Sequence, residues 1–206
     1  MKIINPSIEI ITPIDKNYVY KFIERCGRTC YKSEATEDSA ERFIRGIIKS
    51  GHESVLEHFS FTVKMVCDIG VYKDLTRHRH ASFSIESTRF CNYAKGKFSS
   101  ELKFIYPNHI TDVYTFKVWA DTMKDIEDKY LYMARAGATN DQLRMILPHS
   151  TASEVIMTAN LREWRHILRL RTAKDVHPSV RELMCKLLAE LKEKIPVFFE
   201  DINYDL

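Results

Sequence analysis

Hydrophobic and polar positions follow patterns typical of strands along several stretches of the chain. Between Phe59 and Cys67 every second residue is apolar, which indicates a half-buried strand. The stretch from Ile3 to Thr12 is apolar and β-branched and predicts an opening strand, and Leu102 to Tyr106 predicts another. Glu154 to Asn160 fits a strand or the start of a helix, because the periodicity does not decide between them.

Other segments repeat their apolar residues at the spacing of a helix. Gly51 is placed to end one of them as a left-handed residue, and Pro178 suits the first turn of the last. Seven helices are predicted, starting after Asp15, after Thr36, near Ile69, after Thr111, at Asn140, at Leu161 and at Pro178. Helices therefore dominate a fold with few strands, and we expect an α+β protein with an antiparallel-rich sheet.

Length and composition place the chain among ordinary folded proteins. Its 206 residues and 24.2 kDa fit a single domain over residues 1–206, and 45% hydrophobic with 29% charged residues argues against disorder. We find no internal repeat or linker. The five cysteines form no regular framework, no apolar leader opens the chain, and no apolar run approaches the ~20 residues that span a bilayer. We expect a reduced, cytoplasmic protein that does not enter a membrane.

Arginine and histidine gather in the segment R-H-R-H-A-S-F-S-I-E-S-T-R at residues 77–89. A solvated basic loop is the bland interpretation of such a cluster. The serines that follow offer hydrogen bonds to the same phosphate or carboxylate oxygens that a guanidinium group binds, so we favour an anion site. A net charge of +3 is too small to indicate nucleic-acid binding by itself.

A second basic cluster is expected on the helix that starts at Leu161. Arg162, Arg165, His166 and Arg169 share one face of that helix, which is either a solvated surface or part of an anion site. Arg144 and Arg171 each stand among apolar neighbours, an arrangement that tends to half-bury the charge and to require an anionic partner.

Two familiar kinds of site are not indicated. The six glycines form neither a G-x-G-x-x-G motif nor a phosphate-binding P-loop, so a bound dinucleotide would be held by side chains. The segment His52–His58 lacks the spacing of a zinc-binding helix, and no cysteine is near enough to complete a tetrahedral set. We predict no metal site.

Several motifs resemble those of the flavin-dependent thymidylate synthases. Arg77-His78-Arg79, followed after seven residues by Ser87, resembles the signature of that family. Three further segments are similar to the family's other motifs and extend the resemblance over roughly residues 50 to 185: Gly51–His58, Gln142–Pro148 and Asn160–Arg171.

The resemblance implies a methyltransferase that converts dUMP to dTMP. It implies methylenetetrahydrofolate as the carbon donor, FAD as the redox carrier and NADPH as the reductant, with active sites assembled in a homotetramer. The family uses no enzyme-bound nucleophile, which agrees with the absence of a cysteine in a Pro-Cys-Gln setting.

The resemblance also assigns residues. It implies Arg171 and His52 as catalytic residues. Flavin is expected to contact His52, Ser54, Arg77, His78, Arg79, Ile85, Asn160, Leu161, Arg162 and His166. The nucleotide is expected to contact Asp74, Leu75, Thr76, Arg77, Ile85, Glu86, Ser87, Thr88, Arg89, Arg144 and Arg171.

The chain departs from the family pattern in the nucleotide segment. Asn and Glu are usual where Ser84 and Ile85 stand, and Gln is usual at Asp74. Either Glu86 reaches the site by a small shift, or the backbone alone makes the contact at position 85. Two rivals therefore stay open: a flavoenzyme of the same scaffold that acts on another pyrimidine nucleotide, and a non-enzymatic protein that binds nucleic acid through its arginine clusters.

Overall fold

The computed structural model describes residues 1–96 and 101–204. Its elements form two compact units. Unit 1 comprises Met1–Ser7, Met65–Arg77 and Ser84–Val155, and unit 2 comprises Ile8–Lys64, His78–Phe83 and Ile156–Leu206. None of the described helices is both long and apolar enough to cross a membrane. The five cysteines all lie among the described residues and carry free thiols.

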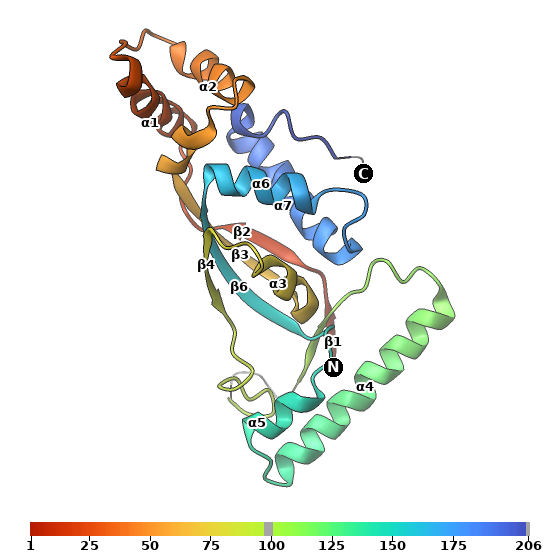
Figure 1. The fold of residues 1–206 in the computed structure, drawn as a ribbon. Coiled ribbons are helices and arrows are strands. Elements are labelled where there is room, and N and C mark those ends of the chain that lie inside the picture. The colour runs from red at the N-terminus through yellow and green to blue at the C-terminus, as the bar shows by residue number, and fades with distance from the viewer. Residues whose placement is uncertain (97–100, 205–206) are drawn as a thin grey trace. The chain divides into compact units, whose positions relative to one another are not determined.

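The strands form a four-stranded and a two-stranded sheet (Figure 1). The larger sheet has the order β2–β3–β6–β4, formed by Ser7–Ile10, Ser60–Asp68, Ala152–Asn160 and Ala81–Ile85. The smaller pairs β1 (Lys2–Ile4) with β5 (Lys103–Ile105) in parallel. Helices with a small, mostly antiparallel sheet confirm the predicted α+β class. The expected opening strand is two short strands, because Pro6 between them lacks the N–H that a ladder needs.

The two long strands show how the sequence pattern becomes a core. In β3 the side chains of Phe61, Val63, Met65 and Cys67 are buried, as their alternation predicts. The segment that periodicity left open is the strand β6, and its buried residues also alternate over most of its length. Burial on one face is what a strand in a helix-covered sheet requires.

Unit 1 contains four helices and an aromatic core among its described residues. The helices are α3 (Ile69–Leu75), α4 (Val113–Arg135), α5 (Asn140–Leu143) and the short helix η4 (Arg144–Ile146). Phe104, Met123 and Tyr130 are buried together, and Trp119 donates a hydrogen bond from Nε1 to Ser150 Oγ at 3.2 Å. The N-cap of α4 is Asp112, one residue later than the predicted Thr111, because its carboxylate accepts the N–H of Thr115 at 2.8 Å.

Unit 2 contains the remaining helices. They are α1 (Lys16–Arg28), α2 (Ser39–Lys49), α6 (Leu161–Arg171), α7 (Pro178–Lys194) and the short helices η1 (Thr29–Tyr31), η2 (Glu53–His58) and η5 (Pro196–Phe198). Asp15 caps α1 as predicted, whereas α2 begins at Ser39 rather than directly after Thr36, behind a left-handed Asp38. Trp164 of α6 is fully buried, stacks on Phe61 and donates its Nε1–H to the Phe61 carbonyl at 3.1 Å. That anchor fixes α6 on β3.

Candidate active site

The segment that carries His52 and Ser54 begins at a helix C-cap. Gly51 has φ of +72°, and its N–H and that of His52 donate to the carbonyls of Ile48 and Ile47 at 3.1 and 2.9 Å. These two bonds form a Schellman motif, which turns the chain sharply out of α2 and into η2. His52 and Ser54 are both exposed at this turn.

The start of α6 lies beside the end of η2. Leu161 donates its backbone N–H to Phe59 at 2.9 Å, and the side chain of Asn160 caps the helix by accepting the N–H of Glu163 at 2.8 Å. The side chain of Leu161 is buried in the core, so only the backbone of this residue lies next to the end of η2. Arg162 is exposed and pairs with Glu57 at 2.5 Å.

A cavity of about 580 Å³ opens over this junction. Asn160, Arg162 and His166, three of the expected flavin residues, line it. His80, Glu53 and Glu57 line it as well. The cavity therefore brings part of the Arg77–Arg89 stretch to the basic face of α6, and its hydrogen-bond donors come from both.

Beside the cavity lies a buried histidine. His78 is 7% exposed, and its ring meets that of His166 edge to face at a centroid distance of 6.1 Å. Arg171, the last residue of α6, donates from Nε to His78 Nε2 at 3.0 Å. Burial lowers the pKa of His78 to about 4, with Arg171 and His166 adding to the effect, so this imidazole is neutral at pH 7.

One member of the predicted basic face has a different role. Arg165 is fully buried rather than part of a ligand-facing or solvated stripe. Its guanidinium group binds Asp201 through two hydrogen bonds of 2.8 Å, Glu53 at 3.1 Å and the carbonyl of Phe198. Arg169 joins the same carboxylates from the exposed side. This charged cluster, which we call the Arg165 clasp, ties η2 and the segment after η5 to α6.

In unit 1 the expected nucleotide residues 87–89 lie in a turn next to α5. Ser87 begins this turn, accepting the N–H groups of Phe90 and Cys91 at 3.0 and 2.9 Å. Arg89 pairs with Asp141 at 3.0 Å, and its carbonyl accepts the side-chain N–H of Asn140 at 2.9 Å. Residues 87–89 and the segment leading into Arg144 are therefore neighbours, as a shared ligand would require. Arg144 is exposed, so the expectation that it is half-buried is wrong, whereas Arg171 is half-buried as predicted.

Each carboxylate oxygen of Glu86 accepts a hydrogen bond from within unit 1. One carboxylate oxygen accepts the hydroxyl of Tyr93 at 2.9 Å, and the other accepts the backbone N–H of Glu154 at 3.3 Å. Burial, followed by the nearby Glu86 carboxylate, raises the pKa of Tyr93, so the phenol stays a donor. Both oxygens of Glu86 thus have structural partners in unit 1, and Ile85 itself is half-buried at the end of β4.

The last turn of α3 leads into the signature arginine. Asp74 is half-buried, Leu75 is part of the core, and Thr76 caps the helix with its hydroxyl on the Lys73 carbonyl at 3.1 Å. Arg77 and Thr88 belong to unit 1, together with the other nucleotide residues except Arg171. The exposed Arg79 belongs to unit 2 with most of the flavin residues.

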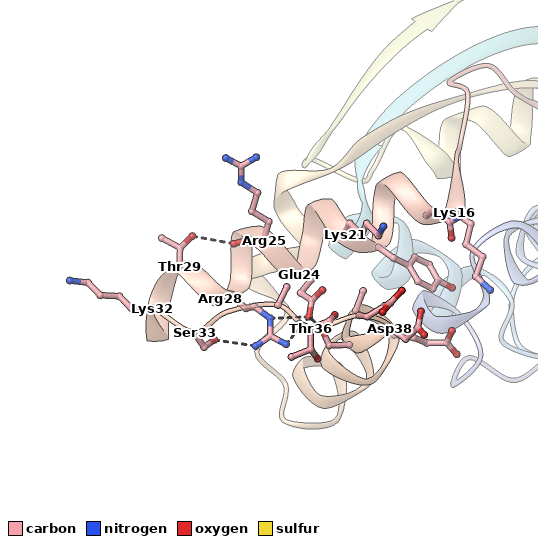
Figure 2. Close-up of a pocket in the computed structure, with 17 residues that line it drawn as sticks. Lys16, Lys21, Glu24, Arg25, Arg28, Thr29, Lys32, Ser33, Thr36 and Asp38 are labelled. Carbon is pink, nitrogen blue, oxygen red and sulfur yellow. Dashed lines mark hydrogen bonds and ion pairs between the residues drawn. The ribbon is translucent and has the colours of Figure 1, made fainter.

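A larger cavity of about 990 Å³ lies elsewhere in unit 2, along α1 and the start of α2 (Figure 2). The polar side chains at its centre already bind one another: Arg28 donates twice to Glu24 at 2.7 and 2.8 Å, and Ser39 donates to the same oxygen at 2.5 Å. In Figure 2, Arg25 and Lys32 point away from this centre. None of the residues that the resemblance assigns lines this cavity.

Sequence reasoning missed two residues that shape the site. Glu163 lies 3.6 Å from His78, and Asp141 pairs with Arg89. Glu163 had a usable signal, since it stands three residues after an N-cap and three before His166, on one helix face. Asp141 gave no such signal in the sequence, because its partner Arg89 is 52 residues away in the chain.

Comparison with known proteins gives one consistent result. Residues 15–197 match the family described as thymidylate synthase complementing protein. A probable flavin-dependent thymidylate synthase of Mycobacterium phage D29 is 30% identical over 197 residues, which cover 87% of this chain and 81% of that protein. The flavin-dependent thymidylate synthase of Corynebacterium diphtheriae is 29% identical over 204 residues, covering 88% and 78%.

A solved structure shares the fold. The UMP/dUMP methylase PolB of Streptomyces cacaoi, bound with 5-Br dUMP, superposes with a TM-score of 0.77 at 21% identity, covering 97% of this chain and 96% of that one. The α+β fold and the family match define a class of flavoprotein transferases of thymidylate synthesis. Within that class, the chain belongs to the flavin-dependent thymidylate synthase family.

Proposed function

We propose that this protein converts dUMP to dTMP, taking its carbon from methylenetetrahydrofolate and its reducing power from NADPH through FAD. Membership of the family supports the reaction class. The observation that carries the proposal within the structure is Arg171: a permanent cation, half-buried at the end of α6 and held by a neutral histidine.

Arg171 meets the main chemical demand of the reaction. A uracil ring must become electron-rich to accept a one-carbon unit, so a fixed cation should stabilise the negative charge that develops on its N–H/C=O edge. A preorganised donor of this kind contributes about 3–4 kcal/mol to transition-state stabilisation in other enzymes. His52 is the second proposed catalytic residue and lies exposed after the Schellman turn.

Replacing Arg171 tests this role directly. Lysine keeps the charge but loses the planar fork and the Nε–H that binds His78, so Arg171→Lys should lower kcat at least 100-fold. Arg45→Lys is the matched control, since Arg45 is half exposed and pairs with Glu200 and Glu41 away from the site. Near-normal turnover in Arg171→Lys would refute the assignment.

The nucleotide would be held by the turn at Ser87 and the arginines beside it. Arg89 can exchange Asp141 for a phosphate at little cost, because both side chains are more than half exposed and such a pair is weak. Since both oxygens of Glu86 are occupied, we infer that the backbone makes the contact at Ile85. The full proposed set is Asp74, Leu75, Thr76, Arg77, Ile85, Glu86, Ser87, Thr88, Arg89, Arg144 and Arg171.

The smaller cavity suits part of a flavin dinucleotide. Its donors Asn160, Arg162 and His166 fit phosphate and ring oxygens, and the half-exposed pair of Arg162 with Glu57 can open at little cost. Bound FAD would supply hydride transfer from NADPH to the transferred carbon. The full proposed set is His52, Ser54, Arg77, His78, Arg79, Ile85, Asn160, Leu161, Arg162 and His166. The exposed Arg77 and Arg79 are proposed to bind the pyrophosphate.

Assembly and location complete the proposal. The family match runs through both units, which supports one functional domain over residues 1–206. We infer a cytoplasmic homotetramer with shared sites, without a metal and without nucleic acid as a partner. Light scattering coupled to chromatography should give about four times 24.2 kDa, and a monomeric mass would contradict the assembly.

An absorption experiment decides between the functions. The purified protein is mixed with FAD, freed of excess, and reduced anaerobically with NADPH in the presence of dUMP, of UMP or of neither. A retained flavin band whose bleaching rate changes with dUMP supports the proposal. A response to UMP alone favours the other pyrimidine nucleotide, and no retained flavin with salt-sensitive DNA binding favours the nucleic-acid binder.

A further inference from the structure

The Nε–H of Arg171 donates a hydrogen bond to a histidine. The Nε of a guanidinium group always carries a hydrogen, so Nε2 of His78 must accept in the 3.0 Å bond between them. An accepting Nε2 leaves the hydrogen of the neutral imidazole on Nδ1. The geometry therefore fixes one tautomer of His78.

Glu163 lies close to the ring nitrogen that carries this hydrogen. Its Oε1 is 3.6 Å from Nδ1 of His78, and the side chains of Glu163 and His78 are 11% and 6% exposed. The distance is beyond a direct hydrogen bond, but a carboxylate so close to an N–H in a poorly solvated place strongly favours the tautomer that carries it. Catalytic contacts of this kind are often long before substrate binds.

We propose that Glu163 is a positioning residue for Arg171 and acts through the Nδ1–H tautomer of His78. This inference rests on the proposed role of Arg171 in the reaction. Without the carboxylate, His78 can place its hydrogen on Nε2, where it opposes the Nε–H of Arg171. The bond then fails, and the guanidinium plane loses a contact that helps to orient it.

The neighbouring side chains admit one competing interpretation. Among the described residues, His78, Glu163 and His166 hold ligand atoms within 4.8 Å of one another, which is the spacing of a possible divalent-metal site. A metal would need the lone pair of His78 Nδ1, yet that atom carries the hydrogen while Nε2 accepts from Arg171. Metal binding and the Arg171 contact therefore exclude each other, and the observed contact favours positioning.

A double-mutant cycle tests whether Glu163 acts through Arg171. Glu163→Leu should lower kcat about 10- to 100-fold, while Glu163→Gln, which keeps an acceptor, should lose less than 10-fold. In the Arg171→Lys background Glu163→Leu should change kcat by less than about 2-fold. Glu182→Leu, which removes a carboxylate paired with Lys186 on α7, is the control and should combine multiplicatively with Arg171→Lys.

Nitrogen NMR of ¹⁵N-histidine-labelled protein reads the tautomer without any turnover, so it separates failure of this inference from failure of the proposed function. We expect the Nδ1–H form of His78 in the unmodified protein and in Glu163→Gln, and a gain of the Nε2–H form in Glu163→Leu. Three results would overturn the inference: an Nε2–H form in the unmodified protein, no change in Glu163→Leu, or multiplicative losses in the cycle. Stoichiometric Zn²⁺ binding that Glu163→Leu abolishes would overturn it in favour of the metal site.

Discussion

The Arg165 clasp leads to a prediction about the stability of the elements that carry the site. Asp201 is the carboxylate that accepts two hydrogen bonds from the fully buried Arg165 and one from Arg169. Asp201→Asn keeps the volume and one acceptor but removes the charge. Arg165 then retains Glu53 as its remaining carboxylate partner. We expect a clear loss of stability without loss of the fold.

The pKa of Asp201 gives the magnitude. Burial alone would raise this pKa, but the hydrogen bonds and charges of Arg165 and Arg169 outweigh burial and lower it from 3.8 to about 2. Unscreened, that change corresponds to about 2.4 kcal/mol of folding free energy. Because the side chain is 39% exposed, water screens the pair, and we expect about 1 kcal/mol in the variant.

Urea unfolding as a function of pH is the assay. A carboxylate whose pKa is lower in the folded state contributes stability that is full above its ordinary pKa of 3.8 and is lost as pH falls toward 2. The free energy of unfolding of Asp201→Asn should therefore lie about 1 kcal/mol below that of the unmodified protein at pH 7. The difference should begin to narrow below about pH 4.

A matched control is the neighbouring Glu200→Gln. Glu200 pairs with Arg45, and both side chains are more than 40% exposed, so its loss should change stability by less than about 0.5 kcal/mol. A difference between Asp201→Asn and the unmodified protein that stays constant from pH 7 to 3, or one no larger than that of Glu200→Gln, would refute the clasp as a source of stability.

Two further predictions concern the residues that shape the site. Gly51→Ala places a side chain at φ of +72° with nothing within 4 Å of the new Cβ, so only backbone strain opposes the substitution. Thermal unfolding should show that the free energy of unfolding falls by about 1 kcal/mol. Gly46→Ala inside α2 is the control and should be neutral or stabilising. Ser87→Ala should raise the Kd for dUMP measured by calorimetry about 10-fold, with chemistry largely retained at saturating nucleotide, because Ser87 is proposed to bind rather than to attack. Abolished chemistry with unchanged affinity would show that Ser87 has a chemical role.

The sequence predicted what depends on local pattern. Alternation defined β3, helical spacing defined α6 and α7, and Asp15 and Gly51 marked helix ends correctly, since caps act through bonds within a few residues. The two clusters of arginine and histidine also contain residues from both segments that line the smaller cavity.

What the sequence could not predict depends on partners far along the chain. Arg165 has the helical spacing of a solvated residue, and its burial depends on partners far along the chain, Asp201 36 positions later and Glu53 112 positions earlier. The pairing of Arg89 with Asp141 and the contact of Arg171 with His78, 93 positions apart, are equally invisible to periodicity. The strand β6 stayed ambiguous because its nature is decided by its neighbours in the sheet.

The placement of the two tryptophans gives the molecule a built-in pair of reporters. Trp119 belongs to unit 1 and is hydrogen-bonded to Ser150, whereas Trp164 belongs to unit 2 and is sealed against Phe61. Since the chain has no other tryptophan, replacing either one by phenylalanine leaves tryptophan fluorescence from a single unit. Following the two emissions during denaturation would reveal whether the halves of this enzyme melt in one cooperative step or in succession.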